Sequence, residues 1–182
     1  MFSEENAAAG VTFARGFKAA GVKAGIKKSG NLDLAMIYTE KEASVAGVFT
    51  QNAVAAAPVI VSREVVKTGS AHAIVANAGC ANACTGEEGM GYCKETAEEA
   101  AKVLGVPENA VLVASTGVIG MQLPMDRLKK GISLLKEAKG STLEHGTAAS
   151  KAIMTTDTVN KEIAVQVELG GTTVTVGGMC KG

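Results

Sequence analysis

Large aromatic side chains are scarce in this 182-residue chain. It has no tryptophan, and the aromatic residues together make up only 3% of the sequence. Glycine occurs 22 times, and 47% of the residues are hydrophobic. A core of small side chains lets backbone segments approach closely, and glycine suits tight turns and direct contact between a ligand and the main chain. The composition therefore predicts a single folded domain over residues 1–182 rather than a disordered chain.

An excess of either charge is also missing. Lysine and arginine total 18, as do aspartate and glutamate, so the formal net charge is zero. A nucleic-acid-binding surface normally shows as an excess of basic residues, so we expect no nucleic-acid partner. No run of 18 apolar residues occurs, so we expect no membrane span. The segment Met1–Glu5 is acidic and lacks the features of a secretory signal, which predicts a cytoplasmic location.

Metal-ligating residues are few and widely spaced. The chain has two histidines and four cysteines, and their spacing matches neither a CxxC pair nor a zinc knuckle. We therefore expect no metal site, and we expect reduced cysteines in the cytoplasm. The cysteines are Cys80, Cys84, Cys93 and Cys180, and the histidines are His72 and His145.

Apolar runs and alternating apolar residues predict a set of strands. A β-hairpin is expected near the end of the sequence, where Ile163, Val165, Val167 and Leu169 alternate with polar residues before a Gly170-Gly171 turn. Glu40–Glu42 should form a charged turn between the first two of the other strands. These strands are Leu32–Thr39, Ser44–Thr50, Pro58–Ser62, His72–Asn77 and Ala110–Ala114.

Three helices are predicted between and after these strands. The first follows a capping box formed by Thr85 and Glu88 and runs to about Leu104. The others span Pro124–Ala138 and Thr147–Met154. Strands and helices are mixed throughout, so the fold class is α/β or α+β.

The most suggestive chemistry lies where the strand Ala110–Ala114 ends. Thr116 offers a hydroxyl and Gly117 a backbone N–H, and two adjacent donors suit a developing oxyanion. An ordinary turn between strand and helix explains the same residues. Two interpretations also exist for Thr155–Thr158 and for Lys181. Thr155–Thr158 fits a helix cap and Lys181 fits a solvated tail, but both also suit a binding site.

Several motifs, in their order and spacing, resemble one family over about residues 10–182. The family is ornithine acetyltransferase, the often bifunctional glutamate N-acetyltransferase of arginine biosynthesis, and the resemblance is to its N-terminal half. The motifs are Gly16–Gly21 (GFKAAG), Asn77–Gly86 (NAGCANACTG), Val113–Gly120 (VASTGVIG), Leu123–Asp126 (LPMD), Ala152–Thr158 (AIMTTDT) and Gly177–Gly182 (GGMCKG).

The resemblance implies a layered α/β sandwich made from a precursor that cuts itself before a threonine. This chain would be the α chain. A β chain from the same precursor would carry the new N-terminal threonine as nucleophile and pair with it, in an α2β2 heterotetramer. The nucleophile itself is absent from this sequence.

The resemblance also implies a ping-pong acetyl transfer from N-acetylornithine to glutamate. Thr116 and Gly117 match the family's oxyanion hole, and Thr155 and Lys181 match substrate-binding positions. No bound cofactor and no metal are implied, and the use of acetyl-CoA as a second acetyl donor stays open. Two other functions are compatible with the same residues. They are a self-processing aminopeptidase or amidohydrolase, and a non-catalytic binding domain in which Thr116-Gly117 is only a turn.

Overall fold

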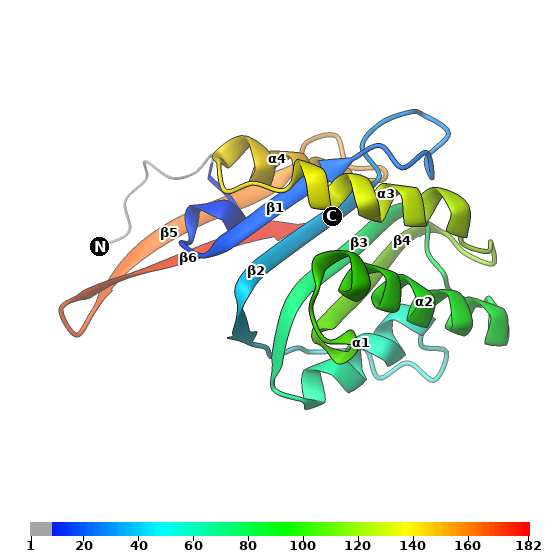
Figure 1. Cartoon of the computed structure of the whole chain (residues 1–182). Helices are drawn as coiled ribbons and strands as arrows, with labels where there is room; N and C mark the ends of the chain where they lie inside the picture. Colours follow the sequence, from blue (N-terminus) through cyan, green and yellow to red (C-terminus); the bar gives the residue numbers. More distant parts are fainter. Residues whose placement is uncertain (1–8) are drawn as a thin grey trace.

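The computed structural model describes residues 9–182, and the segment Met1–Glu5 lies outside them. Within this range a four-stranded sheet is flanked by helices and a separate two-stranded hairpin (Figure 1). The strands are β1 (Phe17–Val22), β2 (Leu34–Ser44), β3 (Ser70–Cys80), β4 (Val111–Val118), β5 (Lys161–Leu169) and β6 (Thr172–Cys180). The helices are α1 (Ala57–Lys67), α2 (Gly86–Leu104), α3 (Met125–Ala138) and α4 (Leu143–Ala152), with short 3-10 helices η2 (Val11–Phe13) and η3 (Glu108–Ala110).

The sheet has the strand order β1-β2-β3-β4. The first two pairings are antiparallel, whereas β3 and β4 are parallel and are connected through α2. Parallel pairing brings the carboxyl ends of β3 and β4 to the same edge of the sheet, so that Asn77 pairs with Ser115 and Ala78 with Thr116. The fold is therefore mixed α/β, as predicted.

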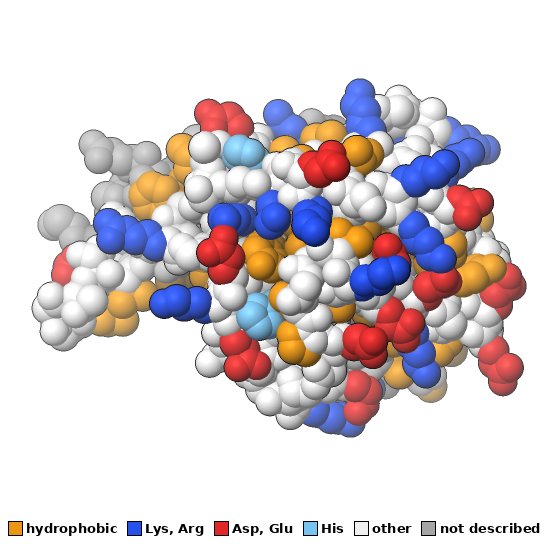
Figure 2. All heavy atoms as spheres, in the orientation of Figure 1, with side chains coloured by type: hydrophobic (Ala, Val, Ile, Leu, Met, Phe, Trp, Pro, Cys, Tyr) orange, Lys and Arg blue, Asp and Glu red, His pale blue; other side chains and the backbone are white. Residues whose placement is uncertain are grey.

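One face of the sheet is fully packed against α2 and α3, which lie in front of it in Figure 1. Residues of α2 and α3 such as Cys93, Ala97, Leu128 and Ile132 pack with Leu34 and other strand residues in one apolar cluster. Acidic and basic side chains are interspersed over the outer surface of these helices (Figure 2), where Lys129 pairs with Glu95 across the two. This face forms the main hydrophobic core.

The opposite face is only half covered. Helix α4, η2 and Met179 of β6 pack over β1 and β2, around Ala19 and Ala35. Over β3 and β4 no element of residues 9–182 gives such cover to the small apolar residues, so Ala114 is exposed and Ile74 is 38% exposed. The β5–β6 hairpin projects from this side of the molecule (Figure 1) and exposes Ile163 and Val176.

Helix α1 closes the outer edge of β4. The Ser62 hydroxyl donates to the Val113 carbonyl oxygen (2.7 Å) and accepts from the Val113 N–H (2.9 Å). These are the main-chain groups that a further strand would use. The predicted strand at Pro58–Ser62 is thus wrong, because this run is the first half of α1. Proline is tolerated in the first turn of a helix, and the buried residues Pro58, Ser62 and Val65 recur at helical spacing.

The predicted strand at Ser44–Thr50 and the turn at Glu40–Glu42 are also wrong. Strand β2 continues through Glu40–Glu42 to Ser44, with a bulge against β3 between Tyr38 and Ala43. The charged side chains stay in solvent there, and Glu40 pairs with Lys18 of β1. After Ser44 the chain is irregular, and Val48 is 100% exposed. An apolar run without a neighbouring strand to pair with does not form a strand.

The predicted capping box does not form, although α2 begins where expected. Thr85 is the N-cap residue but caps no backbone N–H; its hydroxyl donates to the side-chain oxygen of Asn82 (2.7 Å). The Asn82 amide donates in turn to the Gly89 carbonyl (2.9 Å). A buried asparagine therefore stabilises this turn in place of the expected Glu88.

The remaining predicted elements are confirmed. Strands are present over His72–Asn77 and Ala110–Ala114, although the latter starts at Val111, and helices lie near Pro124–Ala138 and Thr147–Met154, the second starting earlier at Leu143. The hairpin turns at Gly170 and Gly171, whose φ values of 58° and 81° suit a type I′ turn. Among the described residues, no helix is both long and apolar enough to cross a bilayer.

Candidate functional site

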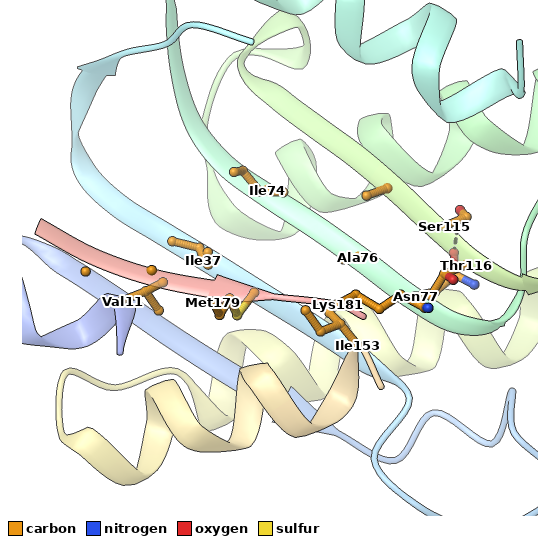
Figure 3. Close-up of a pocket in the computed structure, with 13 residues that line it drawn as sticks. Val11, Ile37, Ile74, Ala76, Asn77, Ser115, Thr116, Ile153, Met179 and Lys181 are labelled. Atoms are coloured by element: carbon orange, nitrogen blue, oxygen red, sulfur yellow. Dashed lines mark hydrogen bonds between the residues drawn. The ribbon is translucent and has the colours of Figure 1, made fainter. Parts of the chain in front are cut away.

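A pocket of about 640 Å³ lies on the half-covered face of the sheet, between the ends of β3 and β4 and the end of β6 (Figure 3). Its wall is mostly apolar, and its polar side chains gather where β3 and β4 end. The lining residues are Val11, Ile37, Ile74, Ala76, Asn77, Ala114, Ser115, Thr116, Ile153, Gly177, Gly178, Met179 and Lys181.

Thr116 lies at the polar end of this pocket and is half-buried. The neighbouring hydroxyl of Ser115 donates to the Asn77 side-chain oxygen (2.6 Å), and the Asn77 amide donates to the Cys80 carbonyl (2.8 Å). The Thr116 hydroxyl, by contrast, makes no hydrogen bond within residues 9–182. It is therefore free to donate to a group in the pocket.

Gly117 follows Thr116 and is exposed. It belongs to β4, which runs on to Val118, so the loop begins at Ile119 and not at Ser115 as predicted. Its φ is +133°, and a Cβ at Gly117 would lie 2.4 Å from the backbone carbon of Gly79 on β3. A glycine is therefore required by the close approach of the two strands, whatever else its N–H does.

Lys181 is the single charged residue among those lining the pocket. It comes just after β6 ends at Cys180, and Figure 3 shows its side chain reaching toward Asn77 and Thr116. Its ammonium group donates to the Gly182 carbonyl (2.8 Å). A lone cation in a mostly apolar wall is suited to bind a carboxylate of a small ligand.

Thr155 lies outside this pocket. It lines a neighbouring polar hollow of about 440 Å³ together with Lys27, Lys151 and Asp157. Ile153, two residues earlier, belongs to the main pocket, so the segment that follows α4 lines both cavities. The structure thus brings Thr116 and Lys181 to one pocket and places Thr155 next to it.

Two ionisable side chains that line the polar hollow, Lys27 and Asp157, have pKa values below their usual ranges. Burial lowers the pKa of Lys27, whose ammonium donates to the carbonyls of Leu32 (2.6 Å) and Ala152 (3.3 Å). The hydrogen bond from Lys161, with others from backbone N–H groups, holds the pKa of Asp157 well below its usual range. Asp157 is therefore a carboxylate at any physiological pH.

The apolar walls of the pocket could not be identified from the sequence. Ile37 and Ile74 sit in strands that were expected, but the alternation of a strand does not say which face stays open. Ile153 and Met179 reach the pocket only because α4 and β6 fold back over the sheet. No local pattern marks these contacts, since they join residues far apart in the chain.

The fold and the pocket define a mixed α/β chain with a small-ligand site on a partly open sheet. A family model described as the ArgJ family matches residues 18–182. The arginine biosynthesis bifunctional protein ArgJ of Symbiobacterium thermophilum is 49% identical over 177 residues, and that of Streptomyces coelicolor is 51% identical over 174. The chain belongs to the ArgJ family.

Solved structures agree with this assignment. The crystal structure of ornithine acetyltransferase complexed with ornithine, from Mycobacterium tuberculosis, has a TM-score of 0.93 at 44% identity, over 100% of this chain and 94% of that one. The ArgJ protein of Bacillus halodurans also gives 0.93, at 42% identity, over 100% and 93%. The α/β fold predicted from the resemblance is thereby confirmed.

The chain spans less than half the length of the curated relatives that it matches. It aligns over 96% of its own length with the S. thermophilum protein but covers 44% of that protein, and for the S. coelicolor protein the figures are 94% and 44%.

Proposed function

We propose that this chain forms the oxyanion-stabilising half of an acyltransferase that moves an acetyl group from N-acetylornithine to glutamate. The observation that carries the proposal is the unpartnered Thr116 hydroxyl at the polar end of a pocket that one cation, Lys181, lines; Gly117 is the next residue of the chain but does not itself line the pocket. Membership of the ArgJ family supports the choice of substrates, as does the ornithine named in the M. tuberculosis structure.

The nucleophile in this proposal is the N-terminal threonine of a second chain. Its free amine takes the proton of its own hydroxyl, and the hydroxyl oxygen attacks the acetyl carbonyl carbon. The carbonyl oxygen becomes an oxyanion, which accepts hydrogen bonds from the Thr116 hydroxyl and the Gly117 N–H. The C–N bond then breaks, ornithine leaves with the proton, and an acetyl ester remains. The glutamate amine attacks the carbonyl carbon of this ester through the same kind of oxyanion; the ester C–O bond then breaks, and the threonine oxygen takes back the proton that the attacking amine loses.

Lys181 is proposed to hold the α-carboxylate that N-acetylornithine and glutamate share. Its side chain reaches toward Thr116 (Figure 3). When the carboxylate of a ligand binds to the Lys181 ammonium group, the remainder of the ligand would lie against the apolar wall of the pocket. Thr155 is proposed as a second substrate contact, reached past the end of α4 from the neighbouring hollow.

The second chain is proposed to cover the open half of the sheet. Without a second chain, water would contact an apolar surface on this face. That surface is formed by Ile74 and Ala114 of the sheet and by Ile163 and Val176 of the hairpin. Coverage supports a two-chain product, since this chain spans 44% of the S. thermophilum protein but 94% of the M. tuberculosis chain. We propose that the two chains come from one self-cleaved precursor and assemble as α2β2.

The proposal also covers the cofactor requirement, the acetyl donor and the location of the protein. The transfer needs no bound cofactor or metal, because the ester carries the acetyl group between the two half-reactions. Acetyl-CoA as a second acetyl donor is compatible with the word "bifunctional" in the relatives' names. The cytoplasm remains our prediction for the location, although two rice relatives are named chloroplastic.

The test is Thr116→Ala in the complex of this chain with its second chain. Removing one oxyanion donor should lower kcat by about 10²–10³, while Thr116→Ser should restore much of the activity. Thr172→Ala, at the exposed start of β6 beside the hairpin turn, is the matched control and should change nothing. Unchanged turnover by the folded Thr116→Ala protein would favour a non-catalytic binding domain.

The same assay separates transfer from hydrolysis. A transferase should produce N-acetylglutamate in proportion to the ornithine released and should depend on glutamate. A self-processing amidohydrolase would release acetate and ornithine at the same rate without glutamate, because water would attack the ester.

A further inference from the structure

We infer that Asp157 is a positioning residue, which holds the chain just beyond β6 so that Lys181 enters the pocket. The inference rests on the proposed function, because it concerns the residue proposed to bind the substrate carboxylate. Asp157 itself does not line the pocket; it lines the neighbouring hollow.

The Asp157 carboxylate accepts three hydrogen bonds, which join three separate segments. Oδ1 accepts from the Lys161 ammonium (2.8 Å) and from the backbone N–H of Gly182 (2.8 Å). Oδ2 accepts from the N–H of Thr155 (3.1 Å). One side chain thus connects the turn after α4, the start of β5 and the chain beyond β6.

The Gly182 contact lies where the strand no longer holds the chain. The last pairing of the hairpin joins Cys180 to Lys161, so Lys181 and Gly182 have no strand partner in the part of the chain that the structure describes. The peptide group between Lys181 and Gly182 is planar, so a hydrogen bond to the Gly182 N–H also fixes the orientation of the Lys181 carbonyl and Cα. The hydrogen bond from Gly182 to Asp157 is therefore the first contact that holds the chain after the hairpin pairing ends, and it orients Lys181, whose side chain lines the pocket.

The surroundings keep Asp157 charged and in place. Its side chain is 1% exposed, whereas that of its partner Lys161 is 44% exposed. Hydrogen bonds to a charged acceptor are about twice as strong as neutral ones. Lys27 lines the same hollow and donates to the carbonyl of Ala152, the last residue of α4, so it holds the start of the turn that carries Asp157.

The experiment is a double-mutant cycle between Asp157→Ala and Lys181→Met in the assembled complex. Asp157→Ala should raise KM for N-acetylornithine about tenfold and change kcat much less, as expected for loss of a charge-assisted hydrogen bond. In the Lys181→Met background the same change should have almost no further effect, because the residue that it positions is gone. Additive effects would overturn the inference, since Asp157 would then act on something other than Lys181.

Two variants guard against a simple folding defect. Asp157→Asn keeps an oxygen for the Gly182 N–H but loses the charge, so its KM should lie between those of wild type and Asp157→Ala. Asp126→Asn, an exposed aspartate in the first turn of α3, is the matched control and should behave as wild type. A KM for Asp157→Asn equal to or above that of Asp157→Ala would also count against the inference.

Hydrogen exchange gives a readout that does not depend on activity. The Gly182 amide of the wild-type complex should exchange slowly, and Asp157→Ala should speed its exchange about tenfold or more, without a similar change at Lys151 in α4. Equal exchange at Gly182 in both proteins would overturn the inference. If the wild-type complex transfers no acetyl group, the proposed function fails, and the exchange measurement still decides whether Asp157 holds the chain.

Discussion

The two faces of the four-stranded sheet are built from similar small apolar residues, yet they differ in what covers them. On one face, Leu128 and Ile132 of α3 are buried against the strands. On the other, Ile74 of β3 is 38% exposed and Ala114 of β4 is exposed. The pocket lies on this second face, where the cover by α4 and β6 stops short of β3 and β4.

This difference separates stability from function within one sheet. The packed face supplies the hydrophobic free energy that holds the chain together, because its side chains are fully removed from water. The open face contributes less to folding, which leaves its residues available for a ligand and for a partner chain. Each of the following predictions tests or refines this division.

The largest effect is expected from truncation in the packed face. Leu128→Ala should lower the free energy of unfolding by about 2–5 kcal/mol, because it leaves a cavity at a site with 0% exposure. Ile74→Ala on the open face should cost well under half as much in the chain without a partner. Urea denaturation at low protein concentration measures both. Equal losses would mean that the two faces contribute alike to folding.

A slightly smaller loss is expected at the point where β3 and β4 touch. Gly117→Ala should cost about 2–4 kcal/mol, since the methyl group would meet Gly79 and the residue would keep a strained φ of +133°. Gly170→Ala, at an open hairpin turn, is the comparison and should cost about 1–2 kcal/mol. Thermal unfolding of the two variants distinguishes packing between strands from turn strain alone.

The open face should also govern association. The chain produced without a partner is expected to be poorly soluble, and Ile74→Lys should shift it toward a monomer by placing a charge on the exposed apolar surface. Glu137→Lys, exposed near the end of α3, is the control and should not improve solubility. Light scattering measures the outcome. A monodisperse wild-type chain would contradict the expectation.

The smallest effect concerns the cysteines, none of which forms a disulfide within residues 9–182. Burial raises the pKa of Cys93 to about 12, so the folded protein keeps a neutral thiol there. Unfolding allows this thiol to ionise above its ordinary pKa of 9.0, so stability should decline slightly as pH rises from about 9. Iodoacetamide at pH 8 should label the exposed Cys84 and Cys180 but label Cys93 only after denaturation.

The sequence predicted the elements whose pattern is local and long. In each of them the apolar residues follow a pattern that buries one face or the whole of the element. They are the helices ending at Leu104 and Ala138, the hairpin, and the strands His72–Asn77 and Ala110–Ala114. The prediction for Pro58–Ser62 failed because four apolar residues and a serine fit a short strand as well as a turn and a half of helix. Only the continuation to Lys67 and the packing of Ser62 on β4 decide between them.

In the candidate site, the local sequence pattern indicated the proposed oxyanion donors but not the residues that surround them. Thr116 and Gly117 stood out because a hydroxyl and a glycine follow a buried strand. That Lys181 would lie in the same pocket came from the family resemblance, since nothing in the spacing of residues 116 and 181 implies it. The Asp157 contact with Gly182 depends on how the end of β6 returns to α4, and such a contact has no signature in the sequence.

The close approach of Gly79 and Gly117 limits how this part of the molecule can change. At Gly117 there is no room for a side chain, and at Gly79 a Cβ would lie 3.2 Å from the Ile26 side chain at a φ of +115°, so peptide groups form the local surface. A peptide N–H survives every substitution except proline, but at Gly117 a larger residue would first meet the backbone of β3. Under the proposed function, selection for a different acyl donor should therefore leave Thr116 and the glycine pair intact and accumulate replacements along the apolar wall.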